Sequence, residues 1–250
     1  MNRKIVIDPE YHHLEEYIRM IPDSFDELGK VIHKDRNILR HDKHAGVVIK
    51  SYKRIYLPNR IRYTYFYPSK AQRAFDFGKH LLANGFLTPK PIAYVECTTN
   101  LLLTSSYFVS EFTDFKPLKM VRELPPEEQT ELLEDFSAFT YRLHLNHIYH
   151  RDYSVGNILF KKIDGRYEFS LVDNNLMDFG PVDFRRGIRT MGRLGLPVDQ
   201  LVAIGKMYGR LWNVDEIDVM ERLFHYQKNM RNAHKLKRSG KQILRKLSPV

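Results

Sequence analysis

Residues 150–173 read HRDYSVGNILFKKIDGRYEFSLVD and contain the clearest structural signal in the chain. Two β-rich runs, NILFK and YEFSLV, flank Asp164 and Gly165, and an Asp-Gly pair between such runs is typical of a β-hairpin. If the turn is centred between these two residues, paired positions sum to about 329, give or take one for the turn type. The sequence therefore predicts that Asn157 and Asp173 lie side by side at the open end of the hairpin.

Two aspartates near the end of this hairpin are candidates for binding a metal ion, Asp173 and Asp178. Asp178 opens the letters Asp-Phe-Gly, which mark the magnesium-binding aspartate of protein kinases. It lies beyond the predicted hairpin, however, whereas Asp173 is the first polar residue after the second strand. Carboxylate and amide oxygens are ligands that magnesium accepts. The register therefore predicts Asn157 and Asp173 as the metal ligands and Asp178 as dispensable.

The segment before the hairpin, HRDYSVGN at 150–157, matches the His-Arg-Asp, four residues, Asn pattern of kinase catalytic loops. Four identities at fixed spacing arise by chance in roughly one chain in a thousand or fewer, given ordinary residue usage. A loop held between a long helix and a hairpin can point Asp152 at an acceptor hydroxyl and let it take the proton. His150 and Arg151 complete the predicted catalytic set. An ion-paired loop without catalysis is the alternative.

The two halves of the chain differ in their predicted secondary structure. Strand signals lie mostly in the first half, at 29–34, 36–41, 45–52, 92–96 and 107–112. Helix signals lie at 9–21, 69–85, 125–148, 197–212 and 214–230. Apart from the hairpin, the second half is helical. We therefore expect an α+β fold with a β-rich domain at 1–112 and a mainly helical domain at 113–250.

Lys50 is the candidate for binding ATP phosphates, because AGVVIKSYK has the Val-x-Ile-Lys form of the kinase phosphate-binding strand. A lysine at a strand end is often merely solvated, so this reading needs an acidic partner. Asp76, in the predicted helix at 69–85, is the best candidate, although kinases use the longer glutamate. The segment 107–115 lies where a kinase hinge presents backbone groups to adenine, and Glu111 is its predicted cofactor-binding residue.

Composition and charge limit the class of protein. The 250 residues are 43% hydrophobic, which suffices for a substantial core. The single Cys97 excludes an internal disulfide and a cysteine zinc cluster. The first residues lack the apolar core of a signal peptide, and the apolar run at 101–110 is too short to cross a bilayer, so we expect a cytoplasmic protein. The net charge of +10 favours an anionic partner such as nucleic acid, a membrane surface or a phosphorylated substrate.

Basic and aromatic residues alternate in one long segment. No acidic residue occurs from Lys43 to Phe75, where seven further Lys and Arg residues interleave with tyrosines and phenylalanines. The tail at 228–250 also lacks acids and carries eight Lys or Arg residues. Aromatic rings among cations suit a bilayer interface or a stacked base. A solvated basic face and a loose tail are the simpler alternatives.

Together, these motifs resemble the lipopolysaccharide kinase family, protein-kinase-like enzymes that phosphorylate Kdo or heptose. The resemblance runs from about Gly29 to Arg193, about two-thirds of the chain. The segments that carry it are 47–53, 54–78, 88–96, 105–112, 150–160 and 169–175. It implies a bilobal kinase fold, ATP with magnesium as cofactors, and a sugar of the lipopolysaccharide inner core as acceptor. It also implies a peripheral location at the inner face of the inner membrane, with no nucleic acid as partner.

Some residues depart from the kinase pattern. There is no Gly-x-Gly-x-x-Gly loop, so residues 29–37 would have to form the turn that covers the ATP phosphates. Asp173 is followed by Asn-Asn in place of Phe-Gly. Ser154 stands where protein Ser/Thr kinases carry lysine, which favours a small-molecule or sugar acceptor. The alternatives are a kinase of another small molecule or of protein, and an inactive kinase-like protein that binds nucleic acid. The arginines at 185, 186, 189 and 193 favour an anionic acceptor over a cationic antibiotic.

Overall fold

The computed structural model describes residues 2–35, 37–52 and 55–247, except the side chains of 234 and 236–247. Arg36, Lys53, Arg54 and most of the predicted basic tail therefore lie outside the described side chains. The chain forms two compact units, Met1–Phe115 with Ser170–Met177, and Lys116–Phe169 with Asp178–Val250. The segment Ser170–Met177, which begins with the last two residues of the hairpin, thus belongs with the first unit. The functional domains predicted at 1–112 and 113–250 stay a prediction.

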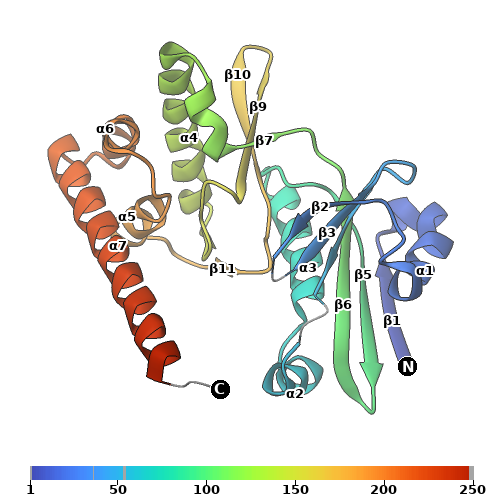
Figure 1. Cartoon of the computed structure of the whole chain (residues 1–250). Helices are drawn as coiled ribbons and strands as arrows, with labels where there is room; N and C mark the ends of the chain where they lie inside the picture. The colour runs from blue at the N-terminus through green and yellow to red at the C-terminus, as the bar shows by residue number, and fades with distance from the viewer. Residues whose placement is uncertain (1, 36, 53–54, 248–250) are drawn as a thin grey trace. The chain divides into compact units, whose positions relative to one another are not determined.

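The first unit is built on a six-stranded antiparallel sheet with the strand order β1-β5-β6-β4-β3-β2 (Figure 1). The strands are β1 Asn2–Ile7, β2 Lys30–Lys34, β3 Ile38–Asp42, β4 Val47–Ser51, β5 Pro91–Thr99 and β6 Leu102–Glu111. All five predicted strands of this half are present, and β1 is an additional one. In the register of the sheet, Lys50 of β4 lies between Leu39 and Phe108 on the neighbouring strands.

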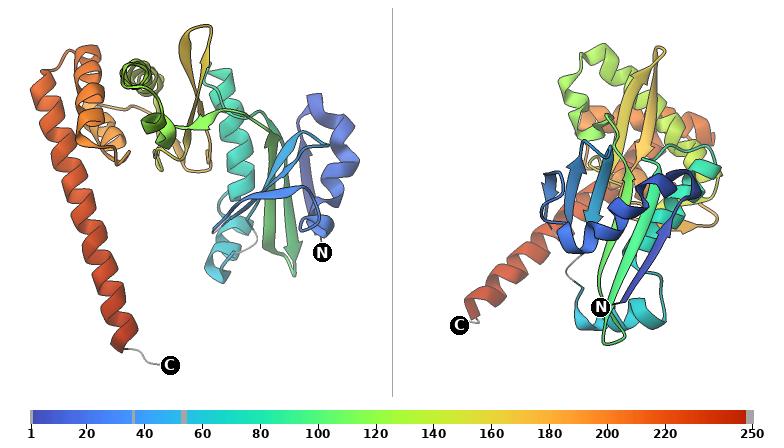
Figure 2. Two further views of the ribbon diagram at one scale, coloured as in Figure 1. Left: turned by 45° about the horizontal axis from the view of Figure 1, so that its top comes forward. Right: turned by 90° about the vertical axis from the view of Figure 1, so that its right-hand side faces the viewer.

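Helices cover both faces of this sheet (Figure 2). One face packs against α1, Glu15–Ser24, whose Ile18 and Ile21 are fully buried against Val47 and Ile49. The other face packs against α3, Lys70–Ala83, whose Phe75 meets Tyr94 edge-on at 5.5 Å between ring centroids. Because side chains alternate along a strand, Lys50 shares the α3 face with Tyr52. The packing thus places the predicted phosphate-binding lysine beneath α3.

Local sequence explains the ends of α3. The Ser69 hydroxyl accepts a hydrogen bond from the Gln72 N–H at 3.1 Å, as expected for an N-cap. The chain leaves the helix through Gly85, whose φ of +75° suits glycine. The predicted helix at 69–85 is therefore confirmed. Besides α1, two helical segments precede it, the 3₁₀ helix η1, Pro9–Leu14, and an unpredicted helix, α2, Leu57–Tyr65.

The second unit contains the predicted hairpin. Strands β9, Ile158–Ile163, and β10, Arg166–Leu171, are neighbours in a small sheet that also includes β7, Lys116–Pro117. Asp164 and Gly165 have φ values of +49° and +82°, the pair of positive angles that a type I′ turn requires. The Asp-Gly signal is thereby confirmed. The hairpin packs on α4, Pro126–Leu145, through Phe169, which contacts Phe136 and Phe139 at 5.5 and 5.2 Å between centroids.

Three helices complete the second unit, α5 Phe184–Gly192, α6 Val198–Trp212 and α7 Glu216–Leu247. The last is longer than predicted, and α5 was not predicted. In α5, packing requires a glycine at position 187, because a Cβ there would lie 2.0 Å from the hydroxyl oxygen of Tyr208 in α6. A 3₁₀ helix, η2 Leu118–Glu123, and the two-stranded pair of β8, Ile148–His150, and β11, Met177–Phe179, complete the elements. Of the helices in the described part of the chain, none has the length and apolar character to cross a bilayer.

Candidate active site

The loop at 150–157 connects β8 to β9 in the second unit, and His150 and Tyr153 anchor it in the core. His150 is fully buried, and its Nδ1 accepts a hydrogen bond from the Asp152 N–H at 3.1 Å. Tyr153 is also buried, and its hydroxyl lies 2.7 Å from the Thr140 Oγ1 of α4. Burial raises the pKa of Tyr153 above its usual value, which keeps the phenol neutral. His150 and Tyr153 are thus held in the core, while the Asp152 side chain between them is exposed.

Asp152 and Asn157 are joined by hydrogen bonds. The Asn157 Nδ2 donates to the backbone carbonyl of Asp152 at 2.9 Å and to its Oδ2 at 3.2 Å. This contact closes the loop and restrains the Asp152 carboxylate. Because the nitrogen of the amide faces Asp152, its oxygen is the atom that Asn157 can offer to a cation. The two residues predicted as base and metal ligand are thus brought together within the second unit.

Asp178 takes part in a network of arginines, a role that the sequence prediction leaves out. Its Oδ1 lies 2.5 Å from the Arg151 Nη2, and its Oδ2 lies 2.8 Å from the Arg186 Nη2. The Arg193 guanidinium donates to the Arg151 carbonyl at 2.7 Å. Arg186 also stacks over the Tyr149 ring at 4.0 Å. Both carboxylate oxygens of Asp178 therefore hold arginines, and one of these is the arginine of the His-Arg-Asp motif.

In the first unit, Asp173 pairs with Lys50. The Lys50 Nζ lies 2.6 Å from the Asp173 Oδ1, with 11% and 27% of the two side chains exposed. Asn175 also donates to the same oxygen. Asp173 has a φ of +61°, a left-handed conformation that aspartate and asparagine tolerate better than most residues. The carboxylate is therefore held at a defined position on the α3 face of the sheet.

The segment that carries Asp173 is fixed to the loop between α3 and β5. The Leu171 N–H donates to the Leu87 carbonyl at 2.9 Å. Asn174, which is 5% exposed, donates through Nδ2 to the Thr88 hydroxyl at 2.8 Å. The Asn-Asn pair that stands in place of Phe-Gly thus has a structural use, since one amide holds the segment and the other holds Asp173.

Within the described residues, Lys50 is seen paired with Asp173 and not with Asp76, so a role of Asp76 beside Lys50 stays a prediction. The side chain of Asp76 hydrogen-bonds Gln72, and its closest charged groups include Lys4 and Glu96. Burial raises its pKa above the usual value for a carboxyl group. The reason for the different pairing is the strand order. Lys4 and Glu96 lie on β1 and β5, whereas Lys50 lies two strands beyond β5, a distance of about 10 Å.

Tyr52 is a neighbour of this pair that sequence reasoning missed. Its ring centroid lies 5.5 Å from the Lys50 Nζ and 5.9 Å from the Lys70 Nζ. Burial, and then the negative charge of Asp173, raise the pKa of the Tyr52 hydroxyl well above its usual value. Tyr52 and Lys70 also border a small cavity of about 30 Å³, room for about one water molecule. The sequence signal that could have predicted this contact is the spacing of Lys50 and Tyr52, since residues two apart on a strand share one face.

Glu111, the predicted hinge residue, is engaged within the first unit. Its carboxylate accepts a hydrogen bond from the Tyr11 hydroxyl at 2.5 Å, and its N–H donates to the Lys90 carbonyl at 2.9 Å. The next residue, Phe112, stacks on His41 of β3 at 4.0 Å between ring centroids. These contacts fix the strand end at β6, and adenine binding at Glu111 stays a prediction.

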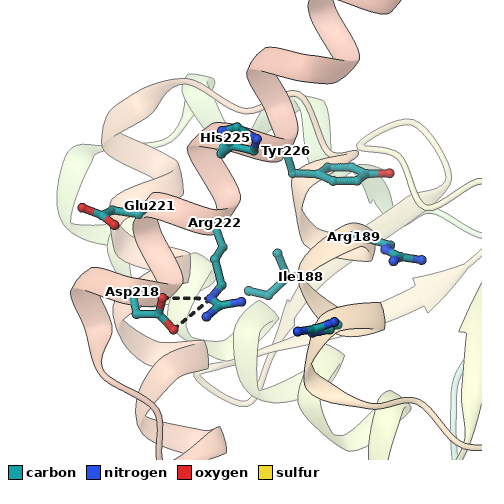
Figure 3. Close-up of a pocket in the computed structure, with 8 residues that line it drawn as sticks. Ile188, Arg189, Asp218, Glu221, Arg222, His225 and Tyr226 are labelled. Carbon is teal, nitrogen blue, oxygen red and sulfur yellow. Dashed lines mark hydrogen bonds and ion pairs between the residues drawn. The ribbon is translucent and has the colours of Figure 1, made fainter.

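A pocket of about 450 Å³ lies between α5 and α7 in the second unit (Figure 3). Arg185 and Arg189 line its α5 side and are exposed. Arg222, on the α7 side, is held by Asp218 at 2.8 Å. The four arginines that favoured an anionic acceptor therefore have two kinds of neighbour. Arg186 and Arg193 contact the catalytic loop and the residues beside it, whereas Arg185 and Arg189 border the pocket.

The predicted metal ligands are one carboxylate and one amide oxygen. Within the described part of the chain, no group of three or more His, Cys, Asp or Glu side chains surrounds a possible cation position. Magnesium in nucleotide sites normally uses only one or two protein ligands and completes its shell with phosphate oxygens and water. Carboxylate and amide oxygens are ligands of the kind that magnesium accepts, and the roles of Asp173 and Asn157 as metal ligands stay a prediction.

Comparison with known proteins identifies the family. The model of the lipopolysaccharide kinase (Kdo/WaaP) family matches residues 40–175, more than half of the chain. The structure of WaaP in complex with acyl carrier protein matches with a TM-score of 0.60 at 16% identity, covering 90% of this chain and 98% of that one. This likeness confirms the predicted α+β, protein-kinase-like fold.

Two further solved structures show weaker similarity. WbdD with the kinase inhibitor LY294002 has a TM-score of 0.48 at 13% identity, covering 78% of this chain and 44% of that one. The yeast RNA polymerase II CTD kinase CTDK-1 has a TM-score of 0.40 at 16% identity, covering 79% and 67%. Comparison with curated proteins returns no match. On the family match, which includes Lys50, the catalytic loop and Asp173, the chain belongs to the lipopolysaccharide kinase (Kdo/WaaP) family.

Proposed function

We propose that this chain transfers the γ-phosphoryl group of ATP to a sugar hydroxyl of the lipopolysaccharide inner core, on Kdo or heptose. The observation that carries the proposal is the loop at 150–157, in which Asp152 is exposed while His150 and Asn157 fix it from both sides. Family membership makes the protein a phosphotransferase that uses ATP. The choice of acceptor group and the roles of single residues are the proposed part.

In the proposed reaction, Asp152 orients the acceptor hydroxyl and accepts its proton as the oxygen attacks the γ-phosphorus. The bond from that phosphorus to the β,γ-bridging oxygen breaks, and ADP leaves. Arg151 is a positioning residue, because Asp178 and Arg193 hold its side chain and its carbonyl. His150 is likewise a positioning residue, through its hydrogen bond to the Asp152 N–H.

The first unit is proposed to bind the nucleotide. Lys50 contacts the phosphates, and Asp173 and Asn157 hold a magnesium ion, which would neutralise charge on the β- and γ-oxygens. The 2.6 Å contact between Lys50 and Asp173 supports a shared role of the two residues in nucleotide binding. Residues 29–37 would cover the phosphates, and Glu111 would lie near adenine. Asp76 has no role in this scheme, since its neighbours are Lys4 and Glu96.

An anionic acceptor is supported by the arginines of α5. Arg185 and Arg189 are exposed beside the pocket of about 450 Å³. Kdo is an acidic sugar with a carboxylate, a group that arginine recognises well. A cationic antibiotic would instead require an acidic pocket. Because the lipopolysaccharide core is anchored in lipid, we further propose that the enzyme works at the cytoplasmic face of the inner membrane.

Mass spectrometry of lipid A-core tests the substrate class. Cells that lack the gene should show core glycolipid lighter by about 80 Da, the mass of one phosphoryl group. Expression of the wild-type chain should restore the mass, whereas the Asp152→Asn variant should not. An unchanged core mass in the deletion strain would exclude the lipopolysaccharide core as acceptor. Tandem fragmentation of the restored species assigns the phosphate to Kdo or heptose.

A further inference from the structure

The helix α2 exposes an apolar face. Leu57, Ile61 and Tyr65 are spaced four residues apart, so they lie on one side of the helix, and they are 59%, 43% and 59% exposed. Phe66 follows at 76%, and Leu101, in the turn between β5 and β6, is 75% exposed. No residue of α2 is buried. This arrangement is the reverse of an ordinary surface helix, which turns its apolar side inward.

Polar contacts hold α2 in this orientation. The Thr64 Oγ1 accepts a hydrogen bond from the Leu103 N–H of β6 at 2.9 Å, and the Tyr65 hydroxyl donates to the Leu101 carbonyl at 3.4 Å. Arg73 of α3 lies over the Tyr63 ring at 5.7 Å. The helix therefore lies beside the β5–β6 turn (Figure 1), held there by Thr64 and Tyr65, while Leu57 and Ile61 stay exposed.

The sequence around this apolar face is basic. No acidic residue occurs from Lys43 to Phe75. Within α2, Arg62 is exposed, whereas the half-buried Arg60 donates to the Ile55 carbonyl at 3.0 Å. Contiguous apolar patches on soluble proteins commonly mark interaction sites. Interfacial helices bury such a face about 5–10 Å into the boundary between headgroups and acyl chains, with basic residues beside anionic headgroups. Tyrosine and phenylalanine favour the same depth.

Other occupants fit this face less well. Nucleic acid would use aromatic stacking and phosphate contacts, which gives no role to Leu57, Ile61 and Leu101. A second copy of the chain in a two-fold dimer would bring the same face together with itself, and therefore the same cations. An anionic bilayer satisfies both the aliphatic side chains and the charge.

We propose that α2 and the β5–β6 turn form a membrane-inserting face, with Leu57, Ile61, Tyr65, Phe66 and Leu101 in the bilayer interface and Arg62 among anionic headgroups. The proposal deepens the proposed function and rests on it, because a lipid-anchored acceptor requires the enzyme to reach the bilayer. It goes beyond charge attraction, since it requires insertion of named side chains. The face should therefore bind anionic vesicles strongly and neutral vesicles weakly.

Sedimentation with vesicles tests the face. The full chain is mixed with vesicles of phosphatidylcholine that contain about one-third phosphatidylglycerol, or of phosphatidylcholine alone. Leu57→Ser/Ile61→Ser should lower the partition coefficient on anionic vesicles by on the order of ten-fold or more, because two aliphatic side chains no longer insert. The matched control is Val198→Ser/Ile217→Ser, which alters two equally apolar residues, each 63% exposed, in the second unit. It should bind as wild type does.

A fluorescent label reports insertion directly. The only cysteine, Cys97, is fully buried, so Phe66→Cys can be labelled selectively with an environment-sensitive dye. The emission should shift to the blue on anionic vesicles and be quenched by brominated acyl chains. Vesicle binding by Leu57→Ser/Ile61→Ser equal to wild type, or a label that stays in water, would overturn the proposal. Light scattering would then show whether a second copy occupies the face.

The catalytic assay separates this proposal from the proposed function. With a delipidated core oligosaccharide as soluble acceptor, Leu57→Ser/Ile61→Ser should transfer phosphate at the wild-type rate. If wild type inserts into vesicles but phosphorylates no core sugar, the proposed acceptor is wrong and the membrane-inserting face stands. If wild type phosphorylates the sugar but α2 does not insert, the proposed acceptor stands and the membrane-inserting face is wrong.

Discussion

The Nζ of Lys50 lies 2.6 Å from the Oδ1 of Asp173, although 123 positions separate the two residues in the sequence. The contact forms because residues 170–177 join the first unit and are fixed to Leu87 and Thr88. It brings together the cation proposed for ATP phosphates and the anion proposed for magnesium. The two side chains with these proposed roles therefore lie within hydrogen-bond distance of each other.

Asp173→Asn should abolish the response of ATP turnover to magnesium. Asparagine keeps the shape and tolerates the φ of +61°, so the variant should fold while losing the charge that holds the ion. Turnover should fall by several orders of magnitude. Magnesium titrations at saturating ATP, with circular dichroism as the check on folding, provide the measurement.

Asp178→Asn is the matched comparison. Its carboxylate holds Arg151 and Arg186, so the variant should lower kcat by about ten- to a hundred-fold through misplacement of the loop. The midpoint of the magnesium titration should stay at the wild-type value. Asp178→Glu should recover part of the rate. A magnesium response lost in Asp178→Asn and kept in Asp173→Asn would show that the metal ligands are assigned the wrong way round.

Lys50→Met should weaken ATP use, while Asp76→Asn should not. Removal of the Lys50 charge takes away a phosphate contact, and we expect kcat/KM for ATP to fall by about a hundred-fold. Asp76 lies near Lys4 and Glu96, so its replacement should change that ratio less than two- to three-fold, within the usual range of surface substitutions. Steady-state kinetics with varied ATP distinguish the two. Equal losses in both variants would restore Asp76 as the partner of Lys50.

Arg185→Gln/Arg189→Gln should raise the KM for the acceptor by about ten-fold or more and leave the KM for ATP unchanged, because the two exposed guanidinium groups border the proposed acceptor pocket. Arg166→Gln, an exposed arginine at the start of β10, is the control for lost positive charge. Kinetics with varied core oligosaccharide give the answer. An acceptor KM that is the same in all three proteins would remove α5 from acceptor binding.

His144 should make the second unit sensitive to acid. Burial, and then the nearby Arg186, lower its pKa to about 3, compared with about 6.5 in an unfolded chain. Between these values the unfolded state binds a proton that the folded state does not, so stability falls as pH falls. The loss should be about 2 kcal/mol from pH 6.5 to pH 5.

Urea unfolding measures this loss, with Trp212 as the reporter, since its ring lies 6.2 Å from Tyr208, the partner of His144. His144→Asn removes the titrating group and should flatten the pH dependence of stability in this range. The same slope in wild type and variant would show that other groups cause the acid sensitivity.

Local signals in the sequence sufficed for much of the fold. Asp164 and Gly165 specify a turn with two positive φ angles, and Ser69 with Gly85 marks both ends of α3. These features depend on neighbouring residues only. The loop at 150–157 was predictable for the same reason, because the spacing of its motif is local.

The remaining features depend on tertiary packing. The choice of Asp173 over Asp76 as the partner of Lys50 follows from strand order and from the segment 170–177 joining the first unit, which no local pattern encodes. Helix α2 was missed because its apolar face does not enter the core, although Pro58 in its first turn was a usable signal. Asp178 was predicted to be dispensable because it lies beyond the hairpin, and its contacts with Arg151 and Arg186 form only in the folded chain.

The most direct test of the central claim is transfer of the labelled γ-phosphate of ATP to lipid A-core from a deletion strain by purified protein. We predict magnesium-dependent incorporation into the core sugars by wild type, and a loss of several orders of magnitude in Asp152→Asn, which removes the proposed base while asparagine preserves the shape of the loop. Binding of ATP, measured separately by calorimetry, should be retained in the variant. Incorporation by Asp152→Asn at a rate near that of wild type would contradict the assignment of the catalytic loop.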